Sequence, residues 1–264
     1  MNLGPRNKRQ PGFTLIELLV ALGIFLLVTG AAFTLLGTSQ KQYQTESQVL
    51  NSFQEARLGL DQIVRDVNDA GYPPPTYVST DPAFFAATPF AWSPGYPNAP
   101  CQIATGGGGN CATATAGDTA PGDFDLIIET NAGLPGAKVQ WIRYQLQGTI
   151  LMRGTVDKAS GQDPDSYMTT NGQIAPFVQN VVNVSSPPGG APVPIFTYTC
   201  DTPTAPQPQP PPCAGVGGAG PDNSPRNIRD VTVTLIVAAP LPDATTGATR
   251  TVQLTGRGRR INPN

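Results

Sequence analysis

The sequence contains no histidine. Histidine is the commonest general base and the commonest zinc ligand, so its absence removes the usual catalytic triads and weakens any expectation of a zinc site. Carboxylate chemistry stays open. However, the sequence shows no nucleophile–base pair, phosphate-binding loop or cofactor fingerprint. We therefore expect no cofactor and no enzymatic activity.

Charged residues are also scarce, at 13% of the chain, and the net charge is −2. The first twelve residues contain Arg6, Lys8 and Arg9 and no acidic residue; removing these three from the 16 basic residues leaves 13 against 18 acidic ones. A chain with this balance lacks the basic surface of a general nucleic-acid binder. We interpret the three arginines between positions 257 and 260 as solvated charge.

Neither of the two close cysteine pairs has the C-x-x-C spacing typical of zinc or thioredoxin-like sites. The pairs are Cys101 with Cys111 and Cys200 with Cys213, each within a Gly- and Pro-rich stretch. Of the possible pairings we favour the local one, in which each disulfide closes a short loop and adds up to about 3 kcal/mol in the chain-entropy model. Disulfides need an oxidising compartment, and free thiols in a reduced protein are the alternative.

No proline interrupts the chain between Pro11 and Pro73, and this segment begins with an apolar run. Residues 13–36 contain one charged side chain, Glu17, and are long enough to span a bilayer as a helix. An ordinary secretory signal has a shorter apolar core, of about 7–15 residues. A plain signal anchor fits the length and the basic N-terminal flank, which places the N-terminus inside. It leaves Glu17 unexplained, because a carboxylate at the bilayer centre costs on the order of 2.5–3.5 kcal/mol.

The stretch GFTLIELLVAL, residues 12–22, resembles the class III signal of type IV pilins and pseudopilins. The resemblance implies that residues 1–12 are a leader, which a membrane peptidase removes between Gly12 and Phe13 before Phe13 is methylated. It also implies that Glu17 of one subunit pairs with the Phe13 amine of the next, which would offset the cost of burying either charge. An acid that merely lies near the bilayer surface is the alternative.

After the apolar run the chain becomes polar but keeps a helical pattern. Apolar residues recur at alternating steps of four and three, which predicts an amphipathic helix over residues 37–72 that ends before three prolines. We expect this stripe to pack on a C-terminal sheet rather than to form a coiled coil. Gly23, Gly30 and Gly37 are soft points of this helix, because glycine costs about 1 kcal/mol relative to alanine in a helix interior. The stripe consists of Val49, Phe53, Ala56, Leu60, Ile63 and Val67.

The remainder of the chain, residues 73–264, is predicted to be a head with long Pro- and Gly-rich loops and an antiparallel sheet. Alternating apolar and β-branched residues indicate the strands, and the fold class is therefore α+β. The predicted strands are 124–130, 138–146, 149–154, 177–184, 194–199, 229–239 and 250–256.

Two further segments resemble the W-type minor pilins of type IV pili and the J-type minor pseudopilins of type II secretion. They are RLGLDQIVRDVNDAGYPPP, residues 57–75, and the hairpin from Tyr144 to Arg153. The resemblance implies a structural and assembly subunit, a minor pilin that acts at filament initiation or at the tip. A minor pseudopilin, or a tip-displayed adhesin or DNA-binding module, is the alternative; an anchored periplasmic enzyme is disfavoured by the missing histidine.

The same resemblance implies partners and a location. The partners would be other minor and major pilins, the prepilin peptidase, the inner-membrane assembly platform and membrane lipid. The protein would cross the inner membrane once, with the N-terminus in the cytoplasm and the head in the periplasm, and would then enter a pilus or pseudopilus filament.

A weak candidate for a calcium site is formed by Asp157, Asp163 and Asp165, which lie close together in sequence. Calcium binds such carboxylates, and some major pseudopilins bind calcium in the head, so the resemblance allows for a site. The EF-hand pattern is not matched. We therefore interpret these residues as solvated loop acids and expect no metal.

Overall fold

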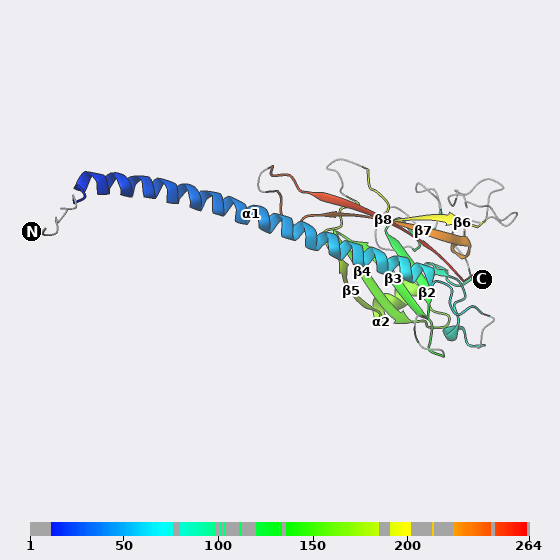
Figure 1. Ribbon diagram of the computed structural model, residues 1–264. Helices are drawn as coiled ribbons and strands as arrows, with labels where there is room; N and C mark the ends of the chain where they lie inside the picture. The colour runs from blue at the N-terminus through cyan, green and yellow to red at the C-terminus, as the bar shows by residue number, and fades with distance from the viewer. Residues whose placement is uncertain are drawn as a thin grey trace, which may run out of the picture.

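The computed structural model has an α+β fold, as predicted, in which one long helix packs on two antiparallel sheets (Figure 1). The first half of the helix extends away from the head, which packs against one side of its second half. The residues that the structure describes are 12–75, 80–98, 101, 103, 111, 120–131, 133, 136–184, 191–201, 213, 224–243 and 246–262.

Helix α1 runs without a break from Leu15 to Asn68, a length of about 80 Å at 1.5 Å per residue. The three glycines named as soft points all lie inside this helix, so they do not interrupt it. Asp69 caps its C-terminal end, and Gly71 follows with φ +84°, a left-handed conformation that glycine adopts at little cost. The predicted stop before Pro73 is thus confirmed to within a few residues.

The larger sheet contains five strands in the order β1-β2-β3-β4-β5, all antiparallel. A tight turn at Gly148, with φ +61°, joins β3 to β4. The short helix α2 follows β4 and lies beside it. The bounds are β1 Phe90–Ala91, β2 Asp125–Thr130, β3 Gln140–Gln147, β4 Ile150–Asp157, α2 Pro164–Asn171 and β5 Gln173–Val178.

The smaller sheet has the order β6-β7-β8, also antiparallel. Helix α1 contacts β7 and β8 of this sheet and β2 and β5 of the larger one, so both sheets share one core against it. The bounds are β6 Phe196–Cys200, β7 Ile228–Ala238 and β8 Thr251–Arg259. The described residues also form two 3-10 turns, η1 Pro82–Phe84 and η2 Pro225–Asn227.

The predicted strand at 177–184 is wrong over most of its length. Strand β5 ends at Val178, and Asn180 follows with φ +56°. The Asn183 side chain then replaces a regular ladder: its amide donates to the Val193 and Thr234 carbonyls at 3.1 and 2.8 Å, and its oxygen accepts from the Ile236 N–H at 2.8 Å. An asparagine that bonds to the backbone competes in this way with strand pairing.

Helix α2 was not predicted from the sequence, which suggested only a loop of acids there. Asp163 caps the helix by accepting a hydrogen bond from the Ser166 N–H at 3.2 Å, and Pro164 occupies the first turn. An Asp-Pro pair is a recognised helix start, so this signal was present in the sequence.

Candidate functional site

The exposed N-terminal half of α1 is the feature of the fold that packing within the chain does not explain. No residue from 12 to 44 is buried, and the apolar side chains are bare; Phe13 is 87% exposed, Phe25 64% and Leu36 53%. Within the described residues, α1 is the one helix long and apolar enough to cross a membrane, and none of its most apolar window is buried. This apolar half of α1 therefore takes no part in the core of the head.

Thr14 and Glu17 close the start of this helix in a capping box. The Glu17 carboxylate accepts from the Thr14 N–H at 3.0 Å and from the Thr14 hydroxyl at 2.9 Å, while the Glu17 N–H donates to the Thr14 hydroxyl oxygen at 3.4 Å. The T-x-x-E spacing is a known sequence signal for this arrangement. Glu17 thus lies one helical turn from Phe13, the residue that directly follows the predicted cleavage point.

A buried polar cluster attaches the second half of α1 to the head. Asp66 accepts from the Tyr144 hydroxyl at 2.5 Å and pairs with Arg153 at 3.0 Å, and Arg153 also donates to the Tyr144 oxygen at 3.0 Å. Burial and the nearby carboxylate raise the pKa of Tyr144, so it stays protonated as a donor. The Tyr144–Arg153 hairpin singled out in the sequence therefore binds the helix directly.

Two glycines of β8 let this strand approach α1 closely. A Cβ atom at Gly258 would lie 2.6 Å from Val67 Cγ1 and 3.2 Å from the Val64 carbonyl oxygen, and one at Gly256 would lie 3.0 Å from Leu60 Cδ1. The apolar stripe of α1 packs here, with Leu60, Ile63 and Val67 buried. The predicted contact between the apolar stripe and the C-terminal sheet thus depends on glycine, which has no side chain, at positions 256 and 258 of β8.

Replacement of Gly258 by valine should separate strand and helix, because the new side chain overlaps Val67. We expect a loss of about 1–3 kcal/mol in the free energy of unfolding, typical of an overpacked core. Denaturant unfolding of the detergent-solubilised protein would measure it. Thr255→Val in the same strand is the control, since Thr255 is exposed; equal stability of the two variants would contradict the proposed contact.

The opposite face of the larger sheet carries a second polar network, beneath the segment 82–98 and α2. Glu129 is fully buried and accepts from the Trp141 N–H at 3.0 Å, the Ala87 N–H at 2.9 Å and the Tyr96 hydroxyl. The buried Lys158 ammonium pairs with the same carboxylate at 2.9 Å. The residues of this network lie far apart in the sequence, so no local pattern predicts it. The network anchors segment 82–98 to the sheet.

Arg143 forms the other part of that face, between Asp125 on the neighbouring strand and Asp165 on α2. Its Nε donates to Asp125 at 3.0 Å, and Gln145 also donates to Asp125, at 3.2 Å. Burial nevertheless raises the pKa of Asp125 to about 6, with the hydrogen bonds from Arg143 opposing the shift. The Asp125 carboxylate therefore takes up a proton at a higher pH than an ordinary aspartate does.

The raised pKa of Asp125 predicts a pH-dependent stability. The folded state takes up a proton near pH 6, whereas the unfolded chain does so only near the ordinary value of 3.8, so folding is favoured as the pH falls from 7 to 5. In Asp125→Asn this contribution is absent. We therefore expect the wild type to gain unfolding free energy relative to this variant as the pH falls below about 6, most steeply near pH 5, about midway between the two pKa values. A difference that stays constant from pH 7 to pH 5 would contradict the assignment.

The three acids of the calcium hypothesis do not converge on one point. Asp163 accepts from the Ser93 hydroxyl at 2.8 Å, Asp165 pairs with Arg143, and Asp157 accepts from the Gln140 amide at 3.4 Å. Among the described residues, no group of three or more acidic or cysteine side chains is arranged to hold a metal ion. The calcium hypothesis therefore has no support from the structure.

Both cysteine pairs form disulfides, and each joins the local partners favoured by the spacing. The sulfur atoms are 2.11 Å apart in Cys101–Cys111 and 2.08 Å apart in Cys200–Cys213. The second disulfide lies at the end of β6, on the side of the head away from the N-terminal half of α1 (Figure 1). Apart from Ile103 and Asp201, the loops between the paired cysteines, including the QPQPPP stretch at 207–212, lie outside the described residues.

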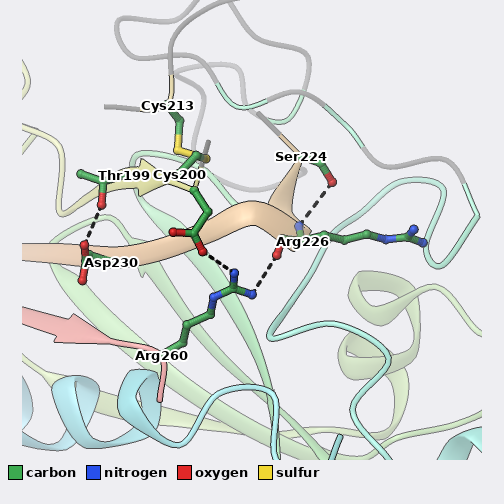
Figure 2. The surroundings of a disulfide bond; sticks show 8 residues. Thr199, Cys200, Cys213, Ser224, Arg226, Asp230 and Arg260 are labelled. Atoms are coloured by element: carbon green, nitrogen blue, oxygen red, sulfur yellow. Dashed lines mark hydrogen bonds and ion pairs between the residues drawn. A yellow bond between two sulfur atoms is a disulfide. The ribbon is translucent and has the colours of Figure 1, made fainter. Parts of the chain in front are cut away.

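The interpretation of the C-terminal arginines as solvated charge is wrong for Arg260, whereas the side chains of Arg257 and Arg259 are 48% and 57% exposed. Arg260 is mostly buried and pairs with Asp201, next to Cys200, at 2.8 Å, and it also donates to the Arg226 carbonyl at 3.0 Å (Figure 2). Arg257 pairs with the buried Asp230 at 2.7 Å. Acids distant in sequence therefore neutralise this basic group.

Comparison with known proteins identifies one segment of the chain. Residues 7–33 match the model of the prokaryotic N-terminal methylation motif. No curated protein and no solved structure gives a match to the chain. The motif covers the predicted cleavage point, Glu17 and most of the exposed apolar helix, and it supports a type IV pilin-like prepilin. The membrane-length helix fits such an anchored protein.

Proposed function

We propose that the protein is a minor pilin, a structural and assembly subunit that acts at the initiation or the tip of a type IV pilus. The observation that carries the proposal is the methylation motif at 7–33, because it lies on an apolar helix that the head leaves bare. An exposed apolar helix of this kind is stable in lipid before assembly and among the helices of other subunits in the filament. The protein is thus a substrate of the prepilin peptidase rather than an enzyme.

The proposed route assigns a task to each part of the chain. Residues 1–12 are a leader that is cut off between Gly12 and Phe13, and Phe13 is then methylated. Residues 13–36 cross the inner membrane with the basic N-terminal flank on the cytoplasmic side, and later enter the filament core. Residues 37–72 carry the periplasmic head, residues 73–264. The partners are the peptidase, the assembly platform and other minor and major pilins.

Glu17 has a specific role in this route. Cleavage creates an ammonium group at Phe13, one turn away from the Glu17 carboxylate that Thr14 holds at the start of the helix. A neighbouring subunit that arrives in the correct register supplies its own ammonium group to this carboxylate. Pairing removes the cost of two charges in apolar surroundings and so selects that register.

A minor pseudopilin of type II secretion would use the same helix in the same way, so phenotype must separate the two machines. Deletion of the gene should abolish or strongly reduce piliation while leaving protein secretion intact. Loss of secretion with normal piliation would assign the protein to the pseudopilus. A head that binds a surface or DNA is a third candidate, and it predicts normal piliation with lost attachment or uptake.

Intact-mass measurement of the protein from cells with and without the prepilin peptidase tests the route. With the peptidase, we expect a chain that lacks residues 1–12 and carries one added methyl group. Without it, the full chain should remain. A leader that is kept in both strains, or a cut after Ala32 as in an ordinary secretory signal, would overturn the proposal.

A further inference from the structure

The connection between β7 and β8, residues 239–250, lies at the end of the head that faces the apolar half of α1 (Figure 1). Strand β8 runs alongside α1 in the same direction. Gly256 faces Leu60, and further along both elements the Arg259 N–H donates to the Asn68 side chain at 2.8 Å. The start of β8, and with it this connection, therefore points toward the N-terminal end of the helix.

The level of this connection along α1 follows from standard spacings. Counting back from Gly256 at about 3.3 Å per strand residue and about 1.5 Å per helix residue places Gly247 roughly level with Gln42 of α1. The burial along the helix agrees with this level, since Thr45 is the first buried residue of α1. The tip of the connection thus lies only about 10 Å beyond Leu36, the end of the apolar run.

The tip is exposed and carries no net charge. Residues 240–242 and 246–250 are exposed, and among them Leu241 is a large apolar side chain with 53% of its surface exposed. The tip contains one base and one acid, and the Arg250 guanidinium pairs with the mostly buried Asp243 carboxylate. A neutral surface with an exposed leucine and an arginine suits the boundary between water and lipid, and anionic headgroups do not repel it.

The length of the apolar run brings this tip close to the membrane surface. Residues 13–36 span about 36 Å as a helix, whereas the hydrocarbon core of a bilayer is about 30 Å thick. A helix longer than the core commonly tilts, and a tilt of about 30° would match the two lengths. The head lies on one side of α1, so a tilt toward that side lowers the connection into the headgroup layer, which is about 5–7 Å thick.

We propose that the tip of this connection, residues 240–250, rests on the lipid headgroups of the membrane that α1 crosses. The inference rests on the proposed function, because it takes residues 13–36 to be the membrane span. Contact at the tip fixes the direction in which α1 tilts and the side of the head that faces the membrane. A subunit that leaves the membrane for a filament then has to give up this contact.

Fluorescence quenching of the full-length protein in phosphatidylcholine vesicles tests the contact. Thr246→Cys would carry an environment-sensitive dye, and the label is unique because all four native cysteines are paired. Lipids with a nitroxide on the headgroup should quench this dye at least about threefold more strongly than a dye at Thr197→Cys. Thr197 is an exposed threonine on β6, toward the other end of the same sheet, and serves as the control.

Leu241→Asp, added to Thr246→Cys, places a second acid on the tip and should reduce the quenching to the value at Thr197→Cys, whereas Leu241→Val should preserve it. The Leu241 side chain is half-exposed, so neither change disturbs the core. Equal quenching at the two labelled positions or no effect of the aspartate would overturn the proposal. So would a signal that disappears when the protein is diluted about tenfold in lipid, since this would indicate a second copy at the tip.

A dye on Leu27→Cys, within the apolar run, separates this inference from the proposed function. Leu27 is 76% exposed, and lipids with a nitroxide on the acyl chain should quench the dye if residues 13–36 span the membrane, whatever the tip contacts. Quenching at Leu27→Cys, with none above the control at Thr246→Cys, would overturn the contact and leave the membrane span in place. Absence of quenching at both positions would contradict the span as well.

Discussion

Glu17→Leu should be processed and inserted into the membrane normally, yet its recovery in filaments should fall by about a hundredfold, equivalent to ~3 kcal/mol. The substitution leaves the cleavage point untouched and makes the helix more apolar. It also removes the carboxylate that meets the Phe13 ammonium group of a neighbour. That ammonium group then lies unpaired among apolar helices, which is the costly arrangement.

Two matched variants separate charge from helix capping. Glu17→Gln retains an oxygen that can accept from the Thr14 N–H and hydroxyl but loses the charge, so it should fail like the leucine variant. Thr14→Ala removes the hydroxyl from the capping box and keeps the carboxylate, so it should assemble, at a cost of about 1 kcal/mol to the helix start. Immunoblots of sheared filaments and of membranes would give both quantities. Filaments that accept Glu17→Gln at the wild-type level would show that the charge has no part in assembly.

Lys158→Met should cost about 3–5 kcal/mol of unfolding free energy, the largest stability effect we expect from a single side chain of the head. The Lys158 side chain is 2% exposed and that of Glu129 0%, so the methionine fills the space but leaves a fully buried carboxylate without its cation. The Phe85 carbonyl loses its 3.2 Å bond as well. Segment 82–98 should therefore detach from the sheet first.

The double variant Glu129→Gln/Lys158→Met removes both charges and should recover part of the loss. Lys138→Met, at an exposed lysine just before β3, should change stability by less than about 0.5 kcal/mol. Denaturant unfolding of all three variants in detergent provides the comparison. If Lys158→Met were as mild as Lys138→Met, water or another cation would have to reach Glu129 in the folded protein.

Regular patterns in the sequence predicted the regular parts of the fold. The 3.6-residue period and the missing prolines predicted α1, and alternation predicted most strands, because each signal is local. The contacts between Asp66 and Tyr144 and between Glu129 and Lys158 join residues distant in the chain and leave no periodic trace.

The N-terminal motif is an exception among functional features, because its chemistry lies within a dozen consecutive residues. Gly12, Phe13 and Glu17 were therefore identifiable without a fold, and their roles in cleavage, methylation and pairing remain predictions. The head gave no comparable signal. Its acids served as helix caps and ion-pair partners, which sequence spacing does not distinguish from metal ligands.

The unbroken helix α1 joins the membrane end of the protein directly to the head. With a length of about 80 Å, a 10° tilt at the membrane end displaces the distal end by roughly 14 Å. A sliding step of one residue along a neighbouring helix is accompanied by a rotation of about 100° if side-chain packing is to be repeated, and the head must turn by the same angle. The choice of register at the base therefore decides which side of the head faces outward, far from where that choice is made.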